Sequence, residues 1–173
     1  MALVKISKGA DIRHEYTDGV SRVPVLEGAY KDAAVERISL QPGAELSPAL
    51  YSKTEHNQVF LITAGKGYIA TPRRVFNITE VSVFVPDFDK EQFTFHCAAD
   101  AKECMEIVHF VTELNDYDKT CLKEAHLTLP RFRGVSQAWH YKEDFTGADI
   151  QQMMMIEHRN LGRLSMGANF GTG

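Results

Sequence analysis

Short runs of alternating apolar and polar residues, separated by glycine and proline, fill the middle of the chain. Side chains of a strand point alternately to the two faces of a sheet, so each run predicts a short strand with one buried face. Such runs cover residues 35–40, 58–63, 68–71, 75–78, 81–85, 92–97 and 105–111. Short strands with regular punctuation are typical of an antiparallel sandwich or barrel. The sequence therefore predicts an all-β fold.

Turn residues lie between these runs. Pro42-Gly43, Pro72-Arg73-Arg74 and Pro86-Asp87 each end a run, because proline and glycine interrupt regular structure. The sequence Ala64-Gly65-Lys66-Gly67 lies between two runs and predicts a hairpin turn. Large aromatic residues within the runs are expected to form the core, and they are Phe60, Phe84, Phe93 and Phe95.

Composition limits the classes of partner. The chain has 173 residues, 24% of them charged, and a formal net charge of -4. A mildly acidic chain with no basic cluster argues against nucleic acid, and no apolar run is long enough for a membrane helix. Cys97, Cys104 and Cys121 form no CxxC motif and read as reduced thiols. With no apolar signal-peptide region in residues 1–9, we expect a cytoplasmic protein.

A weak internal repeat divides the chain. Arg37-Ile38-Ser39-Leu40 reappears as Arg163-Leu164-Ser165-Met166, and the same offset of 126 residues carries His14 onto His140. A repeat fixes the unit of folding. We therefore expect an N-terminal arm (1–30), a barrel (31–115), a linker (116–134) whose end could form an edge segment, and the truncated start of a second barrel (135–173). The strand edges of this truncated copy would be unpaired. We therefore expect the copy to pair with the barrel of its own chain, or to pair with a second chain and so form a homodimer.

Residues 40–111 resemble the cupin family of RmlC-like jelly-roll barrels. The family motifs are G-x5-H-x-H-x(3,4)-E-x6-G and G-x5-P-x-G-x2-H-x3-N. The framework is present in Pro42-Gly43, in the strand and turn 59–67, and in the run 81–86 that leads into the second motif. The resemblance implies a single jelly-roll barrel. Together with the repeat, it is similar to the degenerate first half of a two-barrel cupin.

The metal ligands of the family are not retained. The resemblance places its two histidines at Tyr51 and Lys53, its glutamate at Gln58 and its third histidine at Glu91. A divalent metal prefers converging imidazoles and carboxylates, and a lysine ammonium would repel it. The resemblance therefore implies a barrel without a metal and without another cofactor.

A shifted register would instead bring Glu55, His56, Glu91 and His109 together as a metal site. Against it, adjacent residues such as Glu55 and His56 point to opposite faces of a strand. His109 lies in an apolar run, where it is either a hydrogen-bonded core histidine or a ligand contact. We take as candidate ligand-binding residues Tyr51, Lys53, Gln58, Glu91 and His109.

Lys53 and Glu91 allow two interpretations. They bind an anion or a sugar, or act as an acid/base couple, if burial shifts their pKa values. Alternatively, they form an ion pair that fills the vacated metal site, and we favour this reading.

Three hypotheses follow for function. The first is a metal-free module that binds a small polar ligand, a sugar or a carboxylate, or serves as a dimerising structural unit. The second is the non-catalytic half of a two-barrel enzyme, such as a sugar or sugar-acid isomerase or a ureide hydrolase. The third is a metal-independent acid/base enzyme that uses Lys53 and Glu91. The fold alone does not choose between them, and no catalytic residue is assigned.

Overall fold

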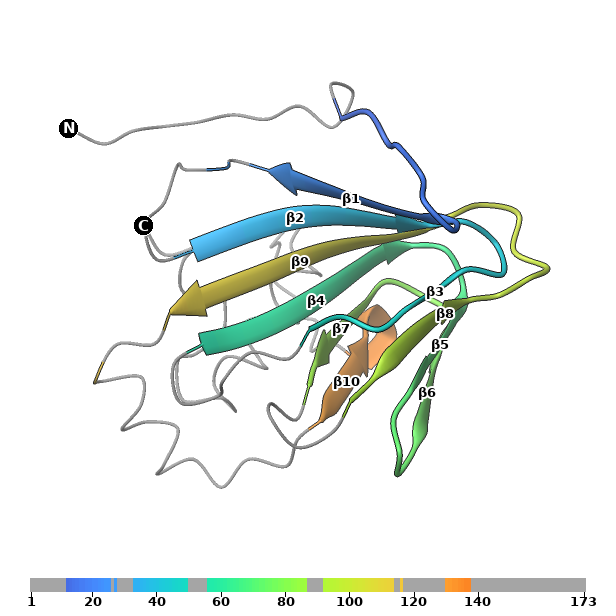
Figure 1. The fold of residues 1–173 in the computed structure, drawn as a ribbon. Helices are drawn as coiled ribbons and strands as arrows, with labels where there is room; N and C mark the ends of the chain where they lie inside the picture. Colours follow the sequence, from blue (N-terminus) through green and yellow to red (C-terminus); the bar gives the residue numbers. More distant parts are fainter. Residues whose placement is uncertain are drawn as a thin grey trace, which may run out of the picture.

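Two antiparallel sheets make up the part of the chain that the computed structural model describes, which is residues 12–25, 27, 33–49, 56–86, 92–113, 116 and 130–137 (Figure 1). The six-stranded sheet has the order β1-β2-β9-β4-β7-β10, and the four-stranded sheet has the order β3-β8-β5-β6. The predicted start of a second barrel lies outside the described residues, apart from residues 135–137.

The large sheet consists of β1 (Val20–Val25), β2 (Ala33–Leu40), β9 (Met105–Glu113), β4 (His56–Ala64), β7 (Ser82–Val85) and β10 (Arg131–Gly134). The small sheet consists of β3 (Glu45–Leu46), β8 (Thr94–Cys97), β5 (Gly67–Ala70) and β6 (Val75–Ile78). A short 3-10 helix, η2 (Val135–Gln137), follows β10. The prediction of an all-β double-sheet architecture is therefore confirmed.

Each of the seven strands predicted from alternation is present, with ends that differ by one to two residues in most cases. At the centre of the large sheet, β9 pairs with β2 on one side and with β4 on the other. Ile38, Phe60 and Ile107 lie on the face of these strands that is directed into the core. The alternating pattern thus predicted which face is buried as well as where the strands lie.

The turn at Gly65 does not form the predicted hairpin. β4 ends at Ala64 and pairs with β7 and β9, whereas β5 begins at Gly67 and pairs with β6 and β8. The chain therefore crosses from the large sheet to the small sheet at this turn. Gly65 has φ +86°, and a Cβ there would lie 2.5 Å from the Cα of Met105. Only glycine accommodates both the left-handed backbone and this close approach.

Four phenylalanines fill the space between the sheets, as predicted. Phe60, Phe84, Phe93 and Phe95 are each at most 1% exposed. Phe60 lies 5.0 Å from Phe95 and 5.4 Å from Phe93, measured between ring centroids. Burial of one such side chain contributes up to about 3 kcal/mol, so this cluster is a main source of stability.

Two edge strands extend the large sheet beyond the predicted set. β1 lies in the stretch expected to be an N-terminal arm and pairs with β2 along its whole length, from Val20 opposite Leu40 to Val25 opposite Val35. β10 lies at the end of the 116–134 segment and pairs with β7. An edge segment was one of the two predictions made for the end of this linker, and β10 is such an edge strand. No helix among the described residues is long and apolar enough to cross a membrane.

Candidate functional site

The structure describes two of the five candidate site residues. Gln58 lies near the start of β4 and His109 lies in β9, and both side chains are directed into the barrel. They are 0% and 2% exposed, respectively. Tyr51, Lys53 and Glu91 lie outside the described residues, so their roles stay predictions.

Strand register brings Gln58 and His109 together. In the β4–β9 pair, Phe60 is opposite His109 and Gln58 is opposite Val111. Gln58 is therefore a diagonal neighbour of His109 on the inward face. The Oε1 of Gln58 lies 2.7 Å from Nε2 of His109, and the imidazole stacks on the Phe60 ring with 4.2 Å between centroids. The histidine is thus held between an amide and an aromatic ring.

A carboxylate that was not among the predicted site residues completes this arrangement. Glu36 of β2 lies opposite His109, and its Oε1 is 2.6 Å from Nδ1 of the imidazole. Glu36 has the same parity in its strand as the core residues Ile38 and Leu40. A carboxylate at an inward position was the signal in the sequence that could have revealed it, because a buried charge requires a partner.

Glu36 has a second partner, Arg22, on the edge strand β1 of the large sheet. Arg22 of β1 donates from Nη2 to Glu36 Oε1 at 2.6 Å and from Nε to Oε2 at 3.1 Å. The exposed fraction falls from 43% at Arg22 to 18% at Glu36 and 2% at His109. We call Arg22, Glu36, His109 and Gln58 the buried polar chain, since it runs from solvent into the barrel.

The electrostatics of the chain fix the direction of its hydrogen bonds. Burial by itself would raise the pKa of Glu36, but hydrogen bonds from His109 and Arg22 outweigh it and lower the pKa from 4.5 to about 2. Glu36 is therefore ionised at neutral pH and only accepts hydrogen bonds. It follows that the Nδ1 of His109 carries a hydrogen and donates it to Glu36.

Gln58 is then left with one polar atom that has no partner. As placed, its Oε1 accepts from His109, and its buried Nε2 has no hydrogen-bond partner in the described structure. If the amide rotated by half a turn, its NH2 would donate to His109 and its oxygen would be the atom left over. In either orientation, Gln58 directs an unsatisfied polar atom into the barrel.

The described donors do not fit the divalent metal that cupin barrels normally hold. His109 has both ring nitrogens in hydrogen bonds, to Glu36 and to Gln58. Gln58, which the sequence resemblance places at the family's glutamate position, supplies a neutral amide. Among the described residues, no three His, Cys, Asp or Glu side chains are grouped so that they could hold a metal ion. The shifted set with Glu55 and Glu91 lies partly outside these residues and is not tested.

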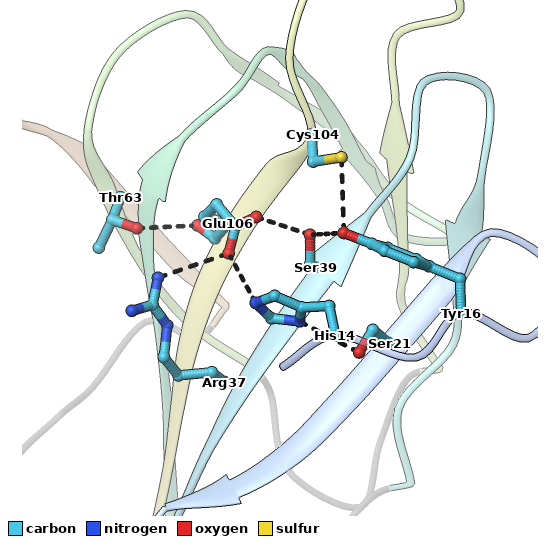
Figure 2. Close-up of polar contacts among 8 residues, drawn as sticks. All are labelled: His14, Tyr16, Ser21, Arg37, Ser39, Thr63, Cys104 and Glu106. Atoms are coloured by element: carbon cyan, nitrogen blue, oxygen red, sulfur yellow. Dashed lines mark hydrogen bonds and ion pairs between the residues drawn. The ribbon is translucent and has the colours of Figure 1, made fainter. Parts of the chain in front are cut away.

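A second polar cluster lies on the opposite, outer face of the large sheet (Figure 2). Its centre is Glu106 of β9, whose Oε1 accepts a hydrogen bond of 2.6 Å from Ser39 of β2. Arg37 and His14 contact the other carboxylate oxygen at 3.5 Å and 4.0 Å. Ser39 is 0% exposed, whereas the side chains of Glu106 and Arg37 are 22% and 30% exposed, so the network is buried at Ser39 and partly open to solvent around it.

The residues before β1 provide this cover. Tyr16 donates from its hydroxyl to Ser39 at 2.9 Å and also contacts the sulfur of Cys104 at 3.8 Å. The Ser39 bond would lower the pKa of Tyr16, but burial and Cys104 raise it, so the phenol stays protonated. The side chains in Figure 2 contact one another, and we interpret the cluster as an attachment of residues 14–16 to the sheet.

Comparison with known proteins identifies the fold. KdgF from a Halomonas species matches with a TM-score of 0.53 at 11% identity, over 66% of this chain and 97% of that protein. A predicted oxalate decarboxylase from Thermotoga maritima matches with a TM-score of 0.51 at 16% identity, over 64% of this chain and 100% of that one. An RmlC-like cupin from Shewanella frigidimarina matches with a TM-score of 0.47 at 15% identity, over 66% and 95%.

No protein-family model matches the sequence, and a search of curated proteins also gave no match. Sequence identities this low establish the fold and nothing finer. The architecture is that of a double-sheet jelly roll. More narrowly, the chain shares its fold with KdgF and with the Thermotoga maritima protein, in agreement with the jelly-roll barrel that its framework residues predicted.

Proposed function

We propose that this chain is a metal-independent cupin-fold module that binds a small polar ligand, a sugar or a carboxylate, inside the barrel beside Gln58. The observation that carries the proposal is the fully buried Gln58 amide with an unpartnered nitrogen. An unsatisfied buried donor costs about 1–3 kcal/mol, and native proteins keep few of them. A ligand that accepts this hydrogen bond would remove the cost.

The surroundings of Gln58 support a binding site. Ligand sites combine an apolar wall with a few fixed polar groups. Phe60 and the phenylalanines packed on it supply the wall. His109, fixed in turn by Glu36, holds the amide in place. A polar group that is already oriented loses little entropy when a ligand arrives.

Tyr51, Lys53 and Glu91 would add contacts to the same ligand under the cupin register. The proposal also includes a cytoplasmic location, which the unpaired cysteines support. It includes a homodimer as well, which the truncated repeat supports. The two enzyme hypotheses gain no support from the described residues.

A screen with a matched pair of variants tests the proposal. Thermal shift and calorimetry would be run with a panel of sugars, sugar acids and small carboxylates. In Gln58→Leu, we expect the ligand-induced shift in Tm to be lost, because the amide that binds the ligand is gone. In the control Gln92→Leu, whose amide only contacts the Pro48 carbonyl at 3.1 Å, the shift should remain. Equal shifts in both variants, or no shift with any compound, would refute the proposal.

A further inference from the structure

One edge of the small sheet is formed by β6, whose sequence Val-Phe-Asn-Ile contains no proline and no charged residue. Among the strands that the structure describes, β6 is the last of its sheet and pairs with β5 alone (Figure 1). The strand at the other edge, β3, has only two residues. An edge strand presents backbone N–H and C=O groups that can pair with another chain. β6 therefore offers the small sheet a place to grow.

The hairpin between β5 and β6 determines which backbone groups of β6 point away from β5. Thr71 donates from its backbone N–H to the carbonyl of Arg74 at 2.9 Å, so these two residues form a hydrogen-bonded pair. Bonded and non-bonded pairs alternate along an antiparallel ladder. Phe76 is therefore bonded to β5, whereas the N–H and C=O of Val75 and Asn77 point to the open side. Both of these residues are exposed, Val75 by 58%.

We propose that β6 pairs antiparallel with β6 of a second copy of this chain, about a two-fold axis that passes beside Phe76. In this register, Val75 lies opposite Asn77 of the second copy, and Asn77 lies opposite Val75. Each pair exchanges N–H···O bonds in both directions, because these are the groups that point outward. The inference rests on the homodimer that forms part of the proposed function, and it assigns the surface through which that dimer forms.

The side chains of β6 suit this arrangement. Phe76 is only partly buried, and its ring packs on Phe84 and Phe132 with 5.8 Å and 5.6 Å between centroids. In the dimer it would lie opposite Phe76 of the second copy in a non-bonded pair, where side chains are closest. Val75 would also lose part of its exposed surface. Burial of this apolar surface favours association.

Charges at the two ends of β6 favour the antiparallel alignment. Arg74 directly precedes the strand and contacts the Phe76 ring, and Glu80 follows it and accepts hydrogen bonds from the neutral donors of Ser136. Within the described part of the chain, neither Arg74 nor Glu80 forms an ion pair. Antiparallel pairing brings the arginine end of each strand to the glutamate end of the other, whereas parallel pairing would bring like charges together. Such complementarity fixes orientation more than affinity.

Sedimentation velocity over a dilution series of the full chain tests the proposal. The paired edge is short, so we expect a dimer that dissociates on dilution. Asn77→Pro removes the outward N–H and keeps the bonds to β5, so the dissociation constant of the dimer should rise by at least about tenfold. The matched control Asn77→Thr keeps this N–H and should change the constant by no more than about threefold. If the proline variant does not fold, Val75→Lys, which places a charge on the edge, should have the same effect.

A cross-linking experiment tests the register. Val75→Cys and Asn77→Cys chains would be mixed and oxidised with glutathione disulfide. Residues in a bonded pair have Cα atoms about 5.5 Å apart, which a disulfide spans. In either variant alone, the new cysteines lie on a diagonal of about 7–8 Å, which is too long. We therefore expect covalent dimers in the mixture well above the level that each variant gives by itself.

The outcomes separate this inference from ligand binding. A dimer that neither Asn77→Pro nor Val75→Lys weakens, or equal cross-linking in the mixture and in the single variants, would overturn the β6 interface alone. A monomer at every concentration would overturn both the interface and the homodimer. The Gln58-dependent shifts in Tm are measured separately, and their loss would overturn the ligand-binding proposal without touching the dimer.

Discussion

Replacing Glu36 by glutamine tests the electrostatics of the buried polar chain. The pKa of Glu36 is lowered from 4.5 to about 2 by its contacts with His109 and Arg22, which outweigh the effect of burial. At 1.36 kcal/mol per pKa unit, this corresponds to about 3 kcal/mol of folding free energy. Because Arg22 is 43% exposed and its contribution is screened by solvent, we expect Glu36→Gln to cost about 2–3 kcal/mol at pH 7.

The lowered pKa of Glu36 also predicts how the stability difference between the unmodified protein and Glu36→Gln changes with pH. A carboxylate with a lowered pKa in the folded state stabilises the protein fully above the unfolded value of 4.5. That stability is lost as the pH falls through the folded value of about 2. The difference between the unmodified protein and Glu36→Gln should therefore shrink between these two pH values and vanish at the lower end.

Urea unfolding at pH 7 and at several points between about pH 4.5 and pH 2 measures this difference. Glu45→Gln is the matched control, because Glu45 contacts His96 at 3.2 Å but its side chain is 70% exposed. We expect the control to cost no more than about 1 kcal/mol. A difference for Glu36→Gln that stays constant with pH would show that the loss comes from packing and that the charge reasoning is wrong.

Two further pairs of variants test the turn and the outer-face cluster. Gly65→Ala should cost roughly 2–3 kcal/mol in urea unfolding, since its Cβ would lie 2.5 Å from the Met105 Cα at φ +86°. Gly43→Ala, with φ +84° but a nearest contact of 3.9 Å, should cost only about 1 kcal/mol, and equal costs would refute the steric argument. Ser39→Ala should cost about 1–3 kcal/mol because it removes a buried hydroxyl that is hydrogen-bonded to both Tyr16 and Glu106. Exposed Ser47→Ala should cost less than about 1 kcal/mol, and a reversed order would contradict this interpretation.

Alternation predicted the strands well because it reports directly which face of a strand is buried. It does not report which strand is the neighbour, since pairing depends on packing across the whole barrel. The turn at Gly65 shows this limit: both flanking strands were predicted, yet they lie in different sheets. β1 was assigned to an N-terminal arm and not to the sheet, because its exposed Arg22 and Pro24 interrupt the apolar pattern.

The candidate site was predicted in part for the same reason. Gln58 was chosen because of its place in the family motif, and His109 because it alternates with apolar residues that face the core. Both side chains are buried inside the barrel. Their meeting with Glu36 depends on the pairing of β2 with β9, which no local pattern encodes. The predicted contributions of Tyr51 and Lys53 concern residues beyond those that the structure describes.

Both outer strands of the large sheet are poor templates for a further strand. Pro24 interrupts β1 with a residue that has no N–H to donate, and β10 is only four residues long and contains Arg131 and Arg133. Short strands, proline and positive charge are the features that discourage edge-to-edge aggregation. We therefore expect the large sheet to resist growth by strand addition, so that a homodimer would form through a sheet face or through the small sheet.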